Sequence, residues 1–246
     1  MEIPSRIRLQ RLIALSTELS RRAAEEAIAH GDVTVNGEVV TTLGTTVDPL
    51  NDRVCVSGRP VKISAERRYI AFFKPRGEIV TKSDPQGRPT IWEHFKEWKG
   101  SLNSVGRLDF DSEGLLILTD DGDFLNRLTH PRHEIWKTYR VRVKGEPSPA
   151  EIATLRDGVP LSDGKTLPAR VRRIDKGGVN ALIEISIREG RNRQVRRMCD
   201  AIGCPVIALR RISVGPVKLG RLKEGAWRFL RGDEVRQLIA MSGYSK

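Results

Sequence analysis

Apolar residues near the start of the chain follow a helical spacing and then an alternating one. Leu9, Leu12 and Ile13 recur at i, i+3 and i+4, which places them on one face of a helix. Ser20 is a suitable N-cap for a second helix. Farther along, apolar residues alternate around the pair Asn36-Gly37, which is typical of a tight hairpin turn. The pattern predicts two short helices followed by small strands.

Most of the remaining chain carries short apolar or alternating runs bounded by turn-forming residues, a pattern typical of strands. A helix-like segment at Trp92–Trp98 and a helix that begins near Asn192 interrupt these runs. The strands that we expect lie at Tyr69–Phe73, Leu115–Leu118, Thr138–Val143, Ala169–Ile174, Ala181–Ile187 and Val206–Arg211.

A linker near Lys62–Arg67 separates the two patterns. We therefore expect a small module at residues 1–65 and a larger domain at residues 66–246. The module has too little core to be an enzyme by itself. Any catalytic chemistry is expected in the larger domain.

The charge of the chain favours a polyanionic partner. Lys and Arg number 43 against 31 Asp and Glu, which gives a formal net charge of +12. A folded chain this basic prefers a polyanion, and nucleic acid is the commonest one. The alternative is a generically basic enzyme. Within the first module, Arg8, Arg11, Arg21 and Arg22 can form a patch that grips RNA phosphates, or simply a solvated helix face.

Cysteine content and hydropathy indicate the compartment. The chain has 3 cysteines and no CxxC pair, which argues against a disulfide framework and fits a reducing cytosol. It shows neither an apolar run long enough to span a membrane nor a signal-peptide pattern. We expect a soluble, cytoplasmic protein with no membrane partner.

One acidic loop is a candidate for catalysis. Asp109 lies between Gly106 and Gly114, which leave room for a substrate, and Arg107 is two residues away. Asp109 can be an activated nucleophile, or it can form a simple surface salt pair with Arg107. A general acid and base pair of the glycosidase kind, formed with Asp111, is a third interpretation.

Metal binding is not expected. Asp120, Asp121 and Asp123 do not match the spacing of a calcium loop. His130 and His133 lie three residues apart, but no Cys or third His lies close enough in sequence to suggest a zinc site.

The helix expected from about Asn192 combines an apolar stripe with a basic side. The stripe comprises Val195, Met198, Cys199 and Ile202. We place Arg193, Arg196 and Arg197 together on the opposite side. The arginines of this region form a candidate phosphate clamp: Arg188, Arg191, Arg193, Arg196 and Arg197. The alternative is a solvated helix face.

The first module resembles the αL RNA-binding domain named after ribosomal protein S-four. The stretch RLQRLIALSTELSRRAAEEAIAHGDVTVNGEVV carries this resemblance. In that family the two helices and the turn after them contact structured RNA. The RNA-binding candidates that the resemblance implies are Arg8, Arg11, Ser20, Arg21, Arg22 and Asn36.

The larger domain resembles pseudouridine synthases of the RsuA family, and in particular its RluB-like branch. The matching pieces, in chain order, are FKPRG, SDPQGRPT, VGRLDFDSEGLLILTDDG, NRLTHP, KTYRV and REGRNRQVRRMCDAIG. The family more often has Thr at the position of Ser112, where this chain keeps a hydroxyl.

The resemblance implies a role for each matched residue. Asp109 is the nucleophile, and Tyr139 packs on the target base and assists proton removal. Arg196 pairs with the nucleophile, and Arg107 evicts and replaces the target base. Val195 lines the pocket.

The resemblance also implies an α/β fold of the α+β kind, in which the catalytic domain has a mixed, largely antiparallel sheet. The implied substrate is a uridine of ribosomal RNA, most readily in the 23S large-subunit RNA, with 16S RNA as the alternative. Neither a cofactor nor a metal is implied, and we expect a monomer. A rival interpretation is an rRNA-binding assembly factor without catalysis, against which the combination of Asp109, Tyr139 and Arg196 argues.

Overall fold

In the computed structural model, the chain divides into two compact units. The first comprises Met1–Arg68 with Phe95–Asn103, and the second comprises Tyr69–His94 with Ser104–Lys246. The structure describes residues 5–17, 19–61, 67–98, 102–175 and 178–243. The boundary expected between residues 65 and 66 lies outside the described residues, so the division at that point stays a prediction.

The first unit contains the two short helices and small strands that the sequence predicts. Its elements are β1 (Ile7–Arg8), α1 (Leu9–Ser16), α2 (Arg21–Ala29), β2 (Val33–Val35), β3 (Glu38–Val39), β4 (Thr46–Val47), β5 (Val54–Val56) and β6 (Arg59–Pro60). The N-cap prediction is confirmed, because the Ser20 side chain accepts a hydrogen bond from Ala23 N. Asn36 and Gly37 have φ of 54° and 93°, as a type I′ hairpin turn requires.

The core of the first unit lies between the helices and the sheet β3-β2-β5-β6. Leu9, Leu12 and Ile13 are buried in it, which confirms the helical face read from the sequence. Ala24 and Ile28 of α2 and Val33 of β2 close the same core.

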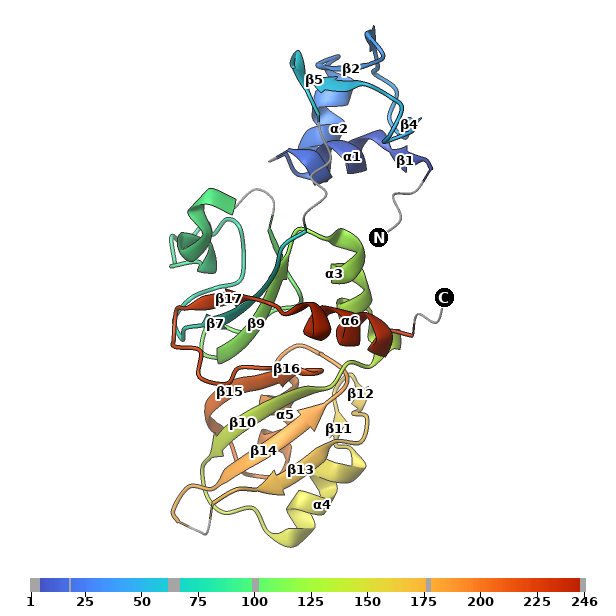
Figure 1. The fold of residues 1–246 in the computed structure, drawn as a ribbon. Coiled ribbons are helices and arrows are strands. Elements are labelled where there is room, and N and C mark those ends of the chain that lie inside the picture. The colour runs from blue at the N-terminus through green and yellow to red at the C-terminus, as the bar shows by residue number, and fades with distance from the viewer. Residues whose placement is uncertain (1–4, 18, 62–66, 99–101, 176–177, 244–246) are drawn as a thin grey trace. The chain divides into compact units, whose positions relative to one another are not determined.

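The second unit is built on one large mixed sheet (Figure 1). Its main strand order is β13-β14-β10-β15-β9-β7-β17, and β16 pairs with β15. The strands are β7 (Tyr69–Lys74), β9 (Glu113–Thr119), β10 (Lys137–Val143), β13 (Arg170–Arg173), β14 (Leu182–Ile187), β15 (Val206–Val214), β16 (Val217–Lys218) and β17 (Trp227–Phe229). Along this path only β15 and β9 pair in parallel, so the expected mixed and largely antiparallel sheet is confirmed.

Short helices and a hairpin complete the second unit. They are α3 (Gly122–Thr129), η2 (Pro131–His133), α4 (Pro149–Asp157), α5 (Gln194–Ala201) and α6 (Gly232–Met241), with the hairpin of β11 (Pro160–Leu161) and β12 (Gly164–Lys165). The segment η1 (Ile91–Trp98) and the strand β8 (Asn103–Ser104) are each divided between the two units. Among the described residues, no helix is both long and apolar enough to cross a membrane.

All the expected strands of the larger domain form, because each alternating or apolar run buries one or both of its faces. The helix-like segment expected at Trp92–Trp98 is not a regular α-helix. That segment is a 3-10 helix in which Phe95 has non-helical φ and ψ of −134° and 39°.

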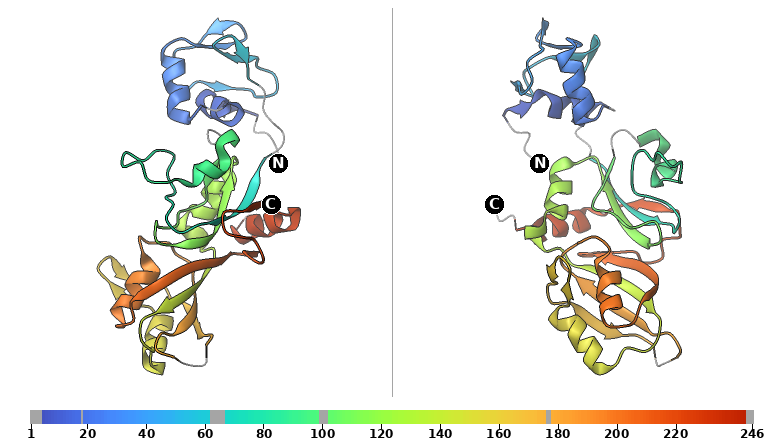
Figure 2. Two further views of the ribbon diagram at one scale, coloured as in Figure 1. Left: turned by 90° about the vertical axis from the view of Figure 1, so that its left-hand side faces the viewer. Right: turned by 180° about the vertical axis from the view of Figure 1, so that it is seen from behind.

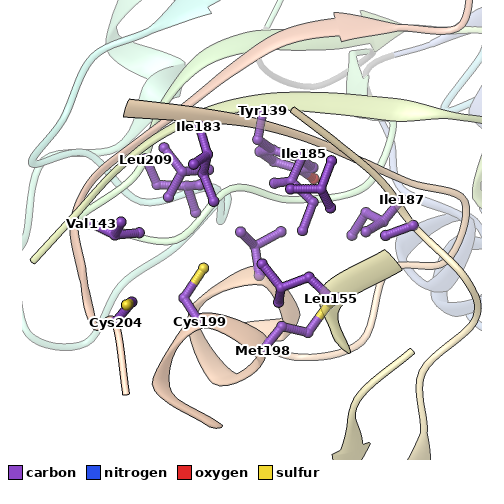
Figure 3. Packing of buried hydrophobic residues seen from close by; sticks show 14 of the residues in the cluster. Tyr139, Val143, Leu155, Ile183, Ile185, Ile187, Met198, Cys199, Cys204 and Leu209 are labelled. Atoms are coloured by element: carbon purple, nitrogen blue, oxygen red, sulfur yellow. The ribbon is translucent and has the colours of Figure 1, made fainter. Parts of the chain in front are cut away.

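Two hydrophobic cores stabilise the second unit. In the first, α4 and α5 cover one face of β13, β14, β10 and β15 (Figure 2). Figure 3 shows Met198 and Cys199 of α5 together with Ile183 and Ile185 of β14 and Tyr139 of β10 in this core. In the second core, α3 and α6 pack with β7 and β9.

A close approach of two strands fixes the start of β9. Gly114 has a φ of 108° and pairs with Arg211 of β15. A Cβ at this position would lie 2.3 Å from the Arg211 carbonyl oxygen, so only glycine fits. The loop that ends at Gly114 is thereby held against β15.

Candidate active site

A cavity of about 570 Å³ opens in the second unit where several loops and strand ends meet. Its volume lies within the range of about 300–1,000 Å³ typical of ligand pockets. One wall is the loop Val105–Asp109, and another is the segment Ile187–Val195 that leads into α5. Lys137 and Tyr139 of β10 and Arg211 of β15 also line it.

Asp109 lies on this cavity with its side chain 35% exposed, so a substrate can reach the carboxylate. The nearest cation is Arg193, whose Nη1 is 3.7 Å from Oδ2 of Asp109. The backbone around Asp109 is fixed by turn hydrogen bonds, since Ser112 N donates to Asp109 O and Gly77 N donates to Phe110 O.

Tyr139 lies on the same cavity and is almost fully buried. It belongs to the hydrophobic core under β10 and β14, which fixes its ring. The cavity therefore brings together a reachable carboxylate and a rigid aromatic ring, two of the groups that the sequence predicted to act on one base.

Arg196 does not pair with Asp109 as expected. Its Nη2 donates to the backbone oxygen of Asp111 at 3.0 Å and to Ser112 Oγ at 3.1 Å, and it lies 3.2 Å from Asp111 Oδ1. Arg196 contacts Asp111 as Arg193 does, but its side chain is only 9% exposed, so it does not lie on a solvated helix face. Arg196 holds the loop that carries Asp109 rather than Asp109 itself.

Asp111 is the acidic centre of this network. Arg193 donates to both of its carboxylate oxygens at 3.3 Å. Burial favours a higher pKa for Asp111, but the hydrogen bond from Arg193 and the charges of Arg196 and Arg193 outweigh it and lower the pKa. Asp111 is thus an ionised anchor between the two arginines.

Lys74 holds the backbone of the loop at residues 109–112. It is fully buried at the end of β7, and its Nζ donates to the backbone oxygens of Pro75 and Ser112 at 2.7 and 2.8 Å. Burial lowers its pKa to about 8, although the charges of Glu78, Asp109 and other acids oppose the shift. The lysine of the FKPRG stretch therefore ties β7 to the 109–112 loop.

The other arginines of the expected phosphate clamp are held by partners within the chain. Arg197 forms an ion pair with Asp163 in the β11–β12 hairpin. Arg191 donates to the backbone oxygens of Gly164 and Lys165, both at 2.8 Å. Arg188 donates to Glu134 at 2.9 Å. RNA phosphates would have to compete with these partners, so the RNA-binding role of the cluster stays a prediction.

Arg107 is exposed, lines the cavity and forms no ion pair with Asp109. The surface salt pair considered from the sequence is therefore absent between these two residues. Because its side chain is not held by Asp109, Arg107 can move toward a substrate.

In the first unit, the candidate RNA-binding residues fall into two groups. Ser20 caps α2, and Asn36 donates to Asp52 Oδ1 and accepts from Arg53 N, so both side chains serve the fold. The others are exposed or half-exposed: Arg8, Arg11, Arg21 and Arg22.

Sequence reasoning missed two cationic residues that line the cavity, Lys137 and Arg211. Lys137 stands two positions before Tyr139 in KTYRV, so the strand period alone could have placed it on the same face. No local signal marks Arg211, which reaches the cavity through the pairing of β15 with β9 and β10. In the described part of the chain, no group of three or more His, Cys, Asp or Glu residues could hold a metal ion.

Comparisons with known proteins agree along the whole chain. The family model of RNA pseudouridylate synthase matches residues 68–201, and that of the S4 domain matches residues 7–54. Ribosomal large subunit pseudouridine synthase B of Bacillus subtilis (strain 168) is 43% identical over 241 residues, which is 97% of this chain and 98% of that protein.

Two further relatives support this result. An uncharacterized RNA pseudouridine synthase of Aquifex aeolicus (strain VF5) is 41% identical over 238 residues, which is 96% of this chain and 95% of that protein. A crystal structure of a pseudouridylate synthase has a TM-score of 0.68 and 33% sequence identity, and the match covers 94% of this chain and 99% of that one. The chain, with its S4 domain, therefore belongs to the RNA pseudouridylate synthase family.

Proposed function

We propose that this protein isomerises a uridine of large-subunit ribosomal RNA to pseudouridine, with Asp109 as the nucleophile. The observation that carries the proposal is the cavity in which the reachable Asp109 carboxylate and the rigid Tyr139 ring lie together. The RNA is suggested by the B. subtilis relative, whose name specifies the ribosomal large subunit.

The reaction breaks the glycosidic bond between carbon-1′ and nitrogen-1, turns the uracil, and joins its carbon-5 to carbon-1′. The base cannot turn inside a stack, so it must first be flipped out, at a cost of a few kcal/mol. In the proposed complex the base enters the cavity beside Tyr139, which offers a stacking surface. In the same complex we expect Arg107, which is exposed and lines the cavity, to fill the gap that the base leaves.

Asp109 then attacks the sugar or removes a sugar proton. Either role requires an ionised carboxylate in a fixed position. The nearest cation is Arg193, whose Nη1 is 3.7 Å from Asp109 Oδ2. The bonds from Arg196 and Lys74 to residues 111 and 112 hold the backbone that carries Asp109.

The test is a comparison of pseudouridines across both ribosomal RNAs, by chemical mapping, in cells with and without this gene. One missing pseudouridine in the large-subunit RNA, restored by the gene, is the expected result. A missing site in the small-subunit RNA would favour that RNA as substrate. Unchanged maps would favour an assembly factor without catalysis.

Replacing both Arg21 and Arg22 with alanine is expected to weaken RNA binding and leave turnover at saturating RNA unchanged. Both side chains are exposed on α2 and have no ion-pair partner within the described residues. Losing two phosphate contacts should flatten the dependence of log affinity on log salt by about two units of slope. Filter binding at several salt concentrations measures this slope.

The matched control removes the exposed arginines Arg172 and Arg231, which are ion-paired in the second unit. That double variant should change the slope less. Equal changes in both variants would mean that net charge, rather than the S4 domain, sets the affinity.

A further inference from the structure

Arg211 is a buried cation that has no acidic partner among the residues that the structure describes. Only 3% of it is exposed, yet it lines the cavity that contains Asp109 and Tyr139. Its Nε donates to the backbone oxygen of Leu115 at 2.6 Å. Within the described part of the chain its Nη2, which is buried, has no hydrogen-bond partner, and the guanidinium forms no ion pair.

A second cation lies on the same cavity. Lys137 is two residues from Tyr139 on β10, so the two side chains leave the strand on the same face. Tyr139 is in turn paired in register with Arg211 of β15. Among the described residues, the Lys137 Nζ donates only to the backbone oxygen of Ile135, at 3.2 Å. Burial lowers the pKa of Lys137 to about 8, and the charge of Arg211 contributes to the shift.

Burying a charge is costly unless the charge is paired. Two neighbouring cations that form no ion pair with a carboxylate in the described part of the chain therefore indicate that an electron-rich group of the substrate completes the site. The RNA strand continues on both sides of the flipped nucleotide, so its phosphates stay at the mouth of the cavity. Only the flipped nucleoside reaches the interior. Because Arg211 is almost fully buried, the group that it meets is the base rather than a phosphate.

We propose that Arg211, assisted by Lys137, binds the carbonyl oxygens of the target uracil and stabilises the negative charge on the base once its glycosidic bond has broken. This inference rests on the proposed function and adds two residues to its chemistry. Buried donors aimed at a developing charge act in a low-dielectric site, where they are most effective.

The electrons balance without a co-reactant. When the bond from carbon-1′ to nitrogen-1 breaks, its electron pair stays with the base and is shared with the two carbonyl oxygens. Asp109 meanwhile bonds to carbon-1′ or takes the proton of carbon-2′. This electron pair forms the new bond between carbon-5 and carbon-1′. In the covalent route the bond from carbon-1′ to Asp109 breaks at the same step; in the other route the proton returns from Asp109 to carbon-2′. The proton lost from carbon-5 is balanced by the one gained at nitrogen-1.

The experiment compares Arg211→Met, Lys137→Met and, as a matched control, Arg210→Met. Arg210 neighbours Arg211 on β15 but is ion-paired with Glu113 and does not line the cavity. We expect Arg211→Met to lower kcat on an rRNA fragment by about 10²–10³-fold, the usual effect of removing one such donor, with KM nearly unchanged. Lys137→Met should lower kcat less, and Arg210→Met should resemble the wild type.

A second substrate separates charge stabilisation from a structural role. A 5-fluorouridine target gives a base whose anion is intrinsically more stable, so bond cleavage should depend less on Arg211. The single-turnover rate of loss of the N-glycoside should therefore fall less in Arg211→Met with this RNA than with uridine. If Arg211→Met does not fold, as judged by thermal unfolding, the same comparison is made with Lys137→Met.

Three results would overturn the inference while the proposed function stands, provided that the wild type is active. The first is a wild-type kcat and KM in Arg211→Met and Lys137→Met. The second is an equal loss of cleavage rate with uridine and 5-fluorouridine. The third is an unchanged kcat with a raised KM and a flatter salt dependence of RNA binding. The last result would assign Arg211 to a phosphate. A wild type that is inactive on ribosomal RNA would instead overturn the proposed function, and with it this inference.

Discussion

Replacing Asp109 with asparagine is expected to lower pseudouridine formation by about 10⁴-fold or more, as the loss of a nucleophile does. The substitution is nearly isosteric and removes the charge and the nucleophilicity of the side chain. Asp109 makes no short side-chain hydrogen bond to any described residue, and the nearest cation, Arg193, is 3.7 Å away. The fold and the affinity for RNA should therefore survive. Product formation on an rRNA fragment and filter binding measure the two effects.

Asp111→Asn is the matched control for this variant. Asp111 lies two residues farther along the same loop and accepts hydrogen bonds from Arg193. A charged hydrogen bond contributes about 1.5–3 kcal/mol, so turnover should fall by about tenfold to a hundredfold and not further. If the two variants lose equal activity, both carboxylates take part, as in the glycosidase-like interpretation. More than a few percent of wild-type turnover in Asp109→Asn would exclude the nucleophile assignment.

Arg196→Lys is expected to lower turnover by about a hundredfold at saturating RNA, although the charge is kept. One nitrogen of the Arg196 guanidinium reaches Asp111 O, Asp111 Oδ1 and Ser112 Oγ within 3.2 Å. A lysine side chain is shorter, and its compact, strongly hydrated ammonium is costly to bury at this site. The loop would shift, and a misplacement of about 1 Å at the reacting group costs about a hundredfold in rate.

Arg197→Lys is the control, because it makes the same exchange one residue farther along α5. Arg197 pairs with Asp163 on the surface hairpin, and a pair of this kind contributes about 0–1 kcal/mol. Its turnover should stay close to that of the wild type. Saturating RNA masks losses of binding in both variants. Equal losses of turnover would show that Arg196 acts as one more surface arginine and that the bonds to the 111–112 loop are dispensable.

Local patterns determined the elements of this protein. The alternating segments Lys137–Val143 and Leu182–Ile187 form strands, because one face of each strand is buried more deeply than the other. The cap at Ser20 and the turn at Asn36-Gly37 depend on residues close in sequence, so short-range chemistry decided them. The family motifs indicated Asp109 and Tyr139, and the cavity contains both.

The partners of the arginines could not be read from the sequence. The apolar stripe of α5 predicts one buried side, which Val195 and Met198 confirm. A helix also buries a second side when another segment packs there, and in α5 Arg196 is buried against the 111–112 loop. That contact joins residues more than eighty positions apart, and the periodicity of a helix carries no information about it.

The sequence by itself determined the strands, the caps, the basic character and the loop that carries Asp109. Each of these follows from the spacing of neighbouring residues or from the chemistry of single side chains. Only the tertiary structure showed three further contacts. Lys74 donates to the backbone of that loop, Arg196 pairs with Asp111 instead of Asp109, and Arg211 lines the cavity. The physical reason is strand pairing: the register of β15 against β9 and β10 decides which distant side chains share one site.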